Sequence, residues 1–182
     1  MEIVNAIPAD LDTVMGLYDY AAVFQRKVFG KGWLGFDKEK VAAEITERRL
    51  WKITEAAEIA CIFIVTYSDP ILWGEHSHES AIYIHRIVTG PEFHGRGYVR
   101  NITAWSIEHA RENSLRFIRM DTWSDNRKLV DYYQNIGFKL VGNVVSEESP
   151  TIPRHYWSTS LALFEIDLND DSQTVQFQTV DR

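Results

Sequence analysis

The sequence predicts a single α/β domain in which helices alternate with strands. The segment 82–142 contains a strand, a glycine turn, a helix, a second strand and a second helix, with no long stretch left over. Before that segment, apolar residues recur at helical and then at strand spacing. The chain has 182 residues, of which 45% are hydrophobic, so it can bury one core but is short for two ordinary domains.

Each element follows from its local pattern. Leu11, Val14 and Tyr18 recur at helical spacing after Pro8, which is a favourable residue in the first turn of a helix. Glycines then interrupt the chain before a second helix. The expected elements are, in order, a strand over 2–7, a helix from Pro8, a helix over 38–49, strands over 51–55, 59–67 and 82–88, a helix from Tyr98, a strand over 116–123, a helix after Asn126, and strands over 139–145 and 160–167.

Composition argues against several classes of protein. No apolar run approaches the ~20 residues of a membrane span, and the first residues lack the pattern of a signal peptide, so we expect a cytoplasmic protein with no membrane partner. The formal charge of −7 argues against a broad nucleic-acid-binding surface. The single cysteine, Cys61, lies in an apolar strand and is expected to be a buried structural thiol.

A glycine turn over 94–97 leads directly into the helix expected from Tyr98. The start of a helix presents unpaired N–H groups and the positive end of the helix dipole, which together favour a bound anion. Gly95 and Gly97 lack a Cβ, so the main chain there can adopt positive φ and approach a bulky phosphate closely. This order of strand, turn and helix favours a site for a phosphate-bearing cofactor.

A second motif follows one strand later: Asn126 precedes a helix that carries Tyr133 and ends in Gly137-Phe138. Together the two motifs resemble the GNAT superfamily of acyl-CoA-dependent N-acyltransferases. That family's loop reads Gln or Arg, two residues, Gly, one residue, then Gly or Ala, and its later motif reads Asn and then Tyr, three residues, Gly and Phe. The resemblance extends from Glu2 to about Leu168.

The resemblance implies one GNAT-like domain over 1–168, with a mixed, mostly antiparallel sheet flanked by helices, and a polar tail over 169–182. It also implies transfer of an acetyl or short acyl group from acetyl-CoA to a primary amine, without a metal. The acceptor amine, a small molecule or a peptide, stays open, as does a homodimer formed through edge strands. The residues implied to bind the cofactor are Ile87, Val88, His94, Gly95, Arg96, Gly97, Tyr98, Val99 and Asn126.

The reaction needs groups that stabilise an oxyanion, protonate a thiolate and remove a proton from the amine. By resemblance, a main-chain N–H near Ile87 or Val88 meets the oxyanion, and Tyr133 protonates the thiolate. Packing of the helix onto the sheet is the alternative role for Tyr133. His85 is the candidate base, because an imidazole titrates near neutral pH. The alternatives to His85 are Glu92, Asp121, Glu165, His155 or a chain of water molecules.

Two residues depart from the family pattern. His94 stands where Gln or Arg is usual, and Val99 stands where a small residue is usual. These departures support an alternative function, a non-catalytic module of the same fold that binds or senses acyl-CoA. A dinucleotide-binding domain is a poorer interpretation, since the third glycine of its fingerprint is missing after Gly97.

Two further features have simple structural explanations. The segment 75–79 carries residue types that bind metals, but it lacks a distant pair of ligands, so we expect a solvated polar loop. Trp33 and Phe36 lie between the first two helices, where they either pack the helices together or line the acceptor pocket that the family places there.

Overall fold

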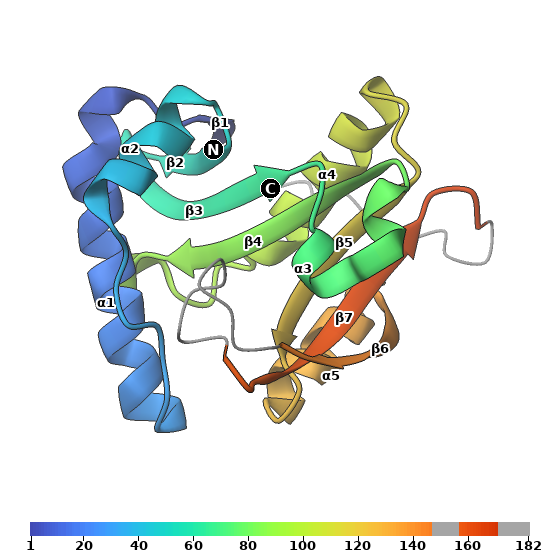
Figure 1. Cartoon of the computed structure of the whole chain (residues 1–182). Helices are drawn as coiled ribbons and strands as arrows, with labels where there is room; N and C mark the ends of the chain where they lie inside the picture. The colour runs from blue at the N-terminus through green and yellow to red at the C-terminus, as the bar shows by residue number, and fades with distance from the viewer. Residues whose placement is uncertain (147–156, 171–182) are drawn as a thin grey trace. The chain divides into compact units, whose positions relative to one another are not determined.

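The computed structural model describes residues 1–146 and 157–170. These residues form a seven-stranded, mostly antiparallel sheet with flanking helices, which confirms the predicted fold class (Figure 1). The hydrogen-bonded strand order is β1-β2-β3-β4-β5-β7-β6. The chain divides into two compact units, and β4 (Ala81–Thr89) contributes residues to both.

The first unit comprises, among the described residues, Met1–Thr66, Ile84–Val99 and Trp157. Its strands β1, β2 and β3 pair in antiparallel order. Its complete elements are β1 (Glu2–Asn5), the 3-10 helix η1 (Pro8–Asp10), α1 (Leu11–Phe29), α2 (Lys38–Thr46), β2 (Leu50–Glu55), β3 (Glu58–Thr66) and the 3-10 helix η3 (Pro91–Phe93). The second part of β4 and the first residues of α4 (Tyr98–Glu112) also belong to it.

The ends of α1 and α2 follow from local chemistry. Helix α1 ends at Gly30, which adopts a left-handed φ of 71° while its N–H donates to the carbonyl of Arg26 at 3.0 Å. Helix α2 is capped by Asp37, whose carboxylate accepts hydrogen bonds from the N–H groups of Glu39 and Lys40. These caps fix where α1 ends and where α2 begins.

The core of the first unit gathers one face of α1 with apolar residues of α2 and the strands. Trp33 is buried in this cluster, and Phe36 packs against it. The ring of Phe36 lies 4.3 Å from that of Tyr18, and the ring of Trp33 lies 6.2 Å from it. The two aromatic residues of the linker therefore pack the helices together, as one of the two predicted roles requires.

The second unit comprises, among the described residues, Tyr67–Tyr83, 100–146 and 158–170. Strand β7 pairs with β5 on one side and β6 on the other, both antiparallel. The elements of this unit are α3 (Pro70–Trp73), the 3-10 helix η2 (Gly74–His78), the first part of β4, most of α4, β5 (Phe117–Trp123), α5 (Arg127–Asn135), β6 (Lys139–Val145) and β7 (Ser160–Asp167).

The structure differs from the sequence-based expectation in a few places. The segment predicted to be a solvated loop over 75–79 instead lies in the short helix η2, which is preceded by α3, except for Glu79, which is its C-cap. Pro70 begins α3, and the Asp69 carboxylate accepts from the N–H of Leu72 at 3.2 Å, so a local cap stabilises a helix too short to show periodicity. The first strand and the helix α2 also end earlier than predicted.

Candidate functional site

The glycine turn of the first unit has the backbone that the sequence predicts. Gly95 and Gly97 adopt left-handed φ values of 79° and 74°, and α4 begins at the next residue, Tyr98. Among residues 1–146 and 157–170, apart from the immediate chain neighbours, no atom lies within 4 Å of the position that a Cβ would occupy at either glycine. Glycine is therefore required here by the backbone conformation and not by crowding, and the space beside the turn is open to a ligand.

His94 is anchored to helix α1. A hydrogen bond of 2.7 Å joins its Nε2 to the Tyr20 hydroxyl, and its ring stacks on Phe24 with 5.5 Å between centroids. At this position the family motif has Gln or Arg. In this chain the imidazole fastens the start of the glycine turn to α1.

Arg96 and Tyr98 both contact the carboxylate of Glu55 at the end of β2. Arg96 forms an ion pair of 2.5 Å with Glu55 and also lies over the ring of Phe93, 5.0 Å from its centroid. Tyr98 donates its hydroxyl hydrogen to the same carboxylate. Burial and this hydrogen bond raise the pKa of Tyr98 to about 12, while the bond from Tyr98 and the charge of Arg96 lower the pKa of Glu55.

The strand before the turn supplies the other predicted contacts of the first unit. Val88 is buried and Ile87 is half-buried. The turn that follows is tight: the N–H of Gly90 donates to the carbonyl of Ala60 at 2.8 Å, and a Cβ on Gly90 would lie 3.3 Å from Phe93. Val99, the other departure from the family pattern, lies half-buried in the first turn of α4.

His85, the predicted base, lies half-buried on β4, where its Nε2 is 3.2 Å from the Thr66 hydroxyl on β3. That contact orients the imidazole ring. The next residue, Arg86, adopts a left-handed φ of 50°, so the regular alternation of side chains between the two faces does not continue through this point.

Asn126 and Tyr133 lie in the second unit. The Asn126 side chain caps α5 by accepting a hydrogen bond of 3.3 Å from the N–H of Leu129. Tyr133 is buried on the same helix, and its ring packs edge-on against Phe138 and Phe164. The packing role of Tyr133 is therefore present, and the catalytic role remains a prediction.

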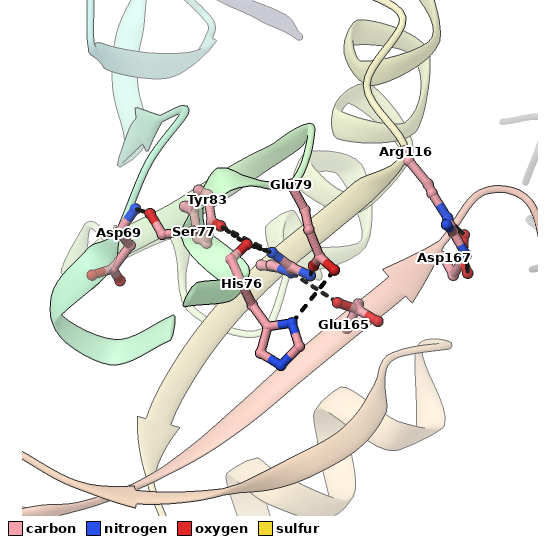
Figure 2. Close-up of polar contacts among 9 residues, drawn as sticks. Asp69, His76, Ser77, Glu79, Tyr83, Arg116, Glu165 and Asp167 are labelled. Carbon is pink, nitrogen blue, oxygen red and sulfur yellow. Dashed lines mark hydrogen bonds and ion pairs between the residues drawn. The ribbon is translucent and has the colours of Figure 1, made fainter. Parts of the chain in front are cut away.

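Among the alternative bases, Glu165 belongs to an ion-pair cluster. Its carboxylate accepts a hydrogen bond of 2.7 Å from Nε of Arg119, whose side chain is 2% exposed. Figure 2 shows Glu165, Glu79 and Tyr83 turned toward one another around that guanidinium. The Glu165 carboxylate is therefore engaged in an ion pair with a buried arginine.

The segment 75–79 takes part in the same cluster. Glu79 pairs with Arg119, and the main-chain carbonyl of His76 accepts from Arg119 Nη1 at 2.7 Å (Figure 2). Ser77 is buried, and its hydroxyl accepts from the N–H of Asp69 at 2.9 Å. Sequence reasoning missed this role because Arg119 lies about 40 residues away in the chain. Of the other candidates, Glu92 is exposed, Asp121 is half-buried, and His155 lies outside the described residues.

Two predictions about surroundings can also be assessed. Cys61 is fully buried, and burial raises the pKa of its thiol to about 12, which confirms a structural thiol. Within residues 1–146 and 157–170, no helix is both long enough and apolar enough to cross a bilayer.

A left-handed glycine turn before a helix, in a chain with a seven-stranded and mostly antiparallel sheet, is the arrangement that the family resemblance implies for an acyl-CoA-dependent N-acyltransferase. The chain belongs to the acetyltransferase (GNAT) family, whose model matches residues 20–138.

Individual relatives agree with this assignment. YesJ of Bacillus subtilis, an uncharacterized N-acetyltransferase, is 23% identical over 145 residues, which are 75% of this chain and 81% of YesJ. A GNAT-family acetyltransferase of Listeria monocytogenes superposes with a TM-score of 0.73 at 22% identity, covering 92% of this chain and 94% of that one. YncA of Salmonella typhimurium, solved with acetyl-CoA, has a TM-score of 0.68 at 16% identity, covering 93% and 95% of the two chains.

Proposed function

We propose that the protein transfers an acetyl or short acyl group from acetyl-CoA to the primary amine of an acceptor. The observation that carries the proposal is the glycine turn: two left-handed glycines, with open space where side chains would stand, directly before α4. Such a turn presents main-chain N–H groups and the positive end of the helix dipole to a pyrophosphate. Membership of the acetyltransferase (GNAT) family supports acetyl-CoA as the donor.

In this proposal the residues of the first unit bind and polarise the donor. The N–H groups near Gly95, Gly97 and Val99 contact the pyrophosphate. A main-chain N–H at Ile87 or Val88 stabilises the negative charge that develops on the thioester oxygen when the amine attacks. His85, oriented by Thr66, removes the proton from the attacking ammonium.

Bond changes and proton transfers balance with solvent as the final acceptor and donor of protons. The amine nitrogen forms a bond to the acyl carbon and releases its second proton to solvent, the carbon–sulfur bond breaks, and the electron pair leaves on sulfur. Tyr133 gives its phenolic proton to that thiolate and is reprotonated from solvent. Asn126 caps α5 and thereby fixes the helix that carries Tyr133, whichever contact it also makes with the cofactor.

The acidic charge of the chain, −7, favours a cationic acceptor over an anionic one. A second candidate function is an acyl-CoA-binding module without turnover, which is supported by the departures from the family pattern at His94 and Val99.

Calorimetric titration with acetyl-CoA, and separately with NAD, tests the donor site. We expect saturable binding of acetyl-CoA alone. Replacing Gly97 by Ala should weaken that binding about tenfold, because an L-residue is strained at positive φ by about 1–2 kcal/mol. The control is Gly16→Ala, at an exposed glycine of α1 whose added Cβ would meet no atom within 4 Å; it should leave binding unchanged.

Thiol release from acetyl-CoA in the presence of a panel of amines then tests catalysis. Cys61 will not interfere with a thiol reagent, since it is buried and its pKa is raised to about 12. Release that depends on an amine establishes the transferase. Binding of acetyl-CoA without release by any amine in the panel favours the binding module, and absence of binding contradicts both.

A further inference from the structure

Arg86 adopts a left-handed backbone within β4, with a φ of 50°. This conformation costs free energy for an L-residue with a Cβ and is common only for glycine, asparagine and aspartate. Such a residue persists when surrounding contacts hold it there. Contacts with neighbouring residues must therefore hold Arg86 in this conformation.

The guanidinium of Arg86 has two kinds of contact. It forms an ion pair with Oε1 of Glu44, a residue of α2. It also lies over two aromatic rings, 5.5 Å from the centroid of Tyr18 and 5.0 Å from that of Phe36. The two charged side chains are largely buried, with exposed fractions of 15% for Arg86 and 13% for Glu44.

The Glu44 carboxylate has only a weak contact with a second cation, Arg49. The guanidinium of Arg49 lies 3.8 Å from Oε1 of Glu44 and makes a closer pair of 2.5 Å with Glu47. Among the described residues, Oε2 of Glu44 and the Tyr18 hydroxyl are buried without a hydrogen-bond partner. A buried carboxylate that is incompletely satisfied adds little to stability. Its effect on the shape of the strand explains its position better.

A left-handed residue rotates the peptide groups on either side of it relative to those of a regular strand. The peptides that follow Arg86 carry the N–H groups of Ile87 and Val88, the donors proposed above for the thioester oxygen. An oxyanion donor works only if it is aimed in advance at the oxygen. The conformation of Arg86 therefore sets the direction of these donors.

We propose that Glu44 is a positioning residue for the acyl transfer: its ion pair holds Arg86 in the left-handed conformation and so aims the N–H groups of Ile87 and Val88. This inference rests on the proposed function for its catalytic consequence. Its structural part, control of the Arg86 backbone by Glu44, stands independently of any activity.

Glu44→Gln removes the charge and keeps the size of the side chain. We expect kcat to fall about tenfold to a hundredfold, while KM for the amine changes little. This fall is no larger than the one caused by removing a whole oxyanion donor. The matched control is Glu47→Gln, which removes a more exposed carboxylate, paired with Arg49, from the end of the same helix. That variant should keep the kcat of the unchanged protein.

A second pair of variants separates shape from charge. In the Glu44→Gln background, Arg86→Gly should restore part of the lost kcat, because glycine adopts positive φ without the ion pair. Arg86→Ala should not restore kcat, since alanine neither forms the ion pair nor adopts positive φ without strain. If the glycine and alanine variants are equally slow, or if Glu44→Gln alone is as fast as the unchanged protein, the positioning role is wrong.

Crystal structures of the unchanged protein and of Glu44→Gln complete the test in a way that needs no turnover. A φ at Arg86 that leaves the left-handed region in the variant supports the inference. A left-handed φ retained in Glu44→Gln overturns it. If the unchanged protein transfers no acyl group to any amine, the proposed function fails by itself, and the two crystal structures still decide whether Glu44 controls the backbone.

Discussion

Arg86 in the first unit and Arg119 in the second have closely similar side-chain surroundings. Each lies on a strand, each forms an ion pair with glutamate, and each has aromatic rings within 6 Å of its guanidinium. The exposed fraction is 15% for Arg86 and 2% for Arg119. The difference between the two lies in the backbone and in how well the paired carboxylate of Arg86 is satisfied.

Arg119 makes hydrogen bonds to several partners. It donates to two carboxylates, to the carbonyl of His76 at 2.7 Å and to the Tyr83 hydroxyl at 3.0 Å, and its backbone is not left-handed (Figure 2). Through these bonds it ties the segment 76–83 to β5 and β7. These contacts compensate the charge of Arg119 without requiring a left-handed backbone in the strand.

Arg86 differs from Arg119 in having an unfavourable, left-handed backbone. Its ion pair with Glu44 leaves one carboxylate oxygen buried and unsatisfied, so the contact contributes less to stability than that of Arg119. A buried arginine can therefore serve two ends. Arg119, whose backbone is not left-handed, stabilises the fold, whereas Arg86, which has a strained backbone and pairs with an incompletely satisfied carboxylate, determines the shape of a strand.

The largest expected effect is on the stability of the second unit. Arg119→Met should lower the free energy of unfolding by about 3–5 kcal/mol, because it leaves two glutamates and a tyrosine without their shared donor. The control is Arg116→Met, which removes a half-exposed ion pair with Asp167 and should cost under about 1 kcal/mol. Urea unfolding followed by circular dichroism measures both. Equal losses would show that Arg119 contributes no more than a surface pair.

The next effect is on turnover. Tyr133→Phe retains the ring contacts with Phe138 and Phe164 and removes only the hydroxyl, so the fold should be kept. We expect kcat to fall about 10²-fold, as for loss of a general acid, with acetyl-CoA affinity changed less than about twofold. Tyr132→Phe, next to it on α5, serves as the control and should not change kcat. Unchanged turnover in Tyr133→Phe would remove this residue from the mechanism.

Local patterns predicted the order of the major elements and the glycine turn. Helical spacing of apolar residues located α1, and the glycines at 95 and 97 indicated left-handed residues that the structure contains. Asn126 was predicted to precede a helix, and its side chain caps α5. These features depend on neighbours in the sequence, and each residue type has a strong local preference.

Features that depend on distant residues could not be predicted. The pairs Arg86 with Glu44 and Arg119 with Glu79 join residues about 40 positions apart, and nothing in the local sequence marks either partner. The positive φ of Arg86 could not be predicted either, because arginine has no preference for positive φ, whereas glycine does. Tyr20 and Glu55, which hold His94 and Arg96, were missed for the same reason.

The smallest expected effect is on the stability of the glycine turn. This turn combines glycines that have a local preference with side chains held by residues distant in the sequence. Hydrogen bonding from Tyr98 and the charge of Arg96 lower the pKa of Glu55 in the folded protein relative to the unfolded chain. The stabilisation from Glu55 is therefore complete above its unfolded pKa of about 4.3 and is lost as the pH falls through the lower folded value. Glu55→Gln should reduce the melting temperature slightly at pH 6, and the difference from the unchanged protein should shrink toward pH 3.

Glu108→Gln, at an exposed position on α4, should show no such convergence. A difference that stays constant from pH 6 to pH 3 would mean that the ionised form of Glu55 does not stabilise the turn, and that Arg96 is held mainly by its contact with Phe93.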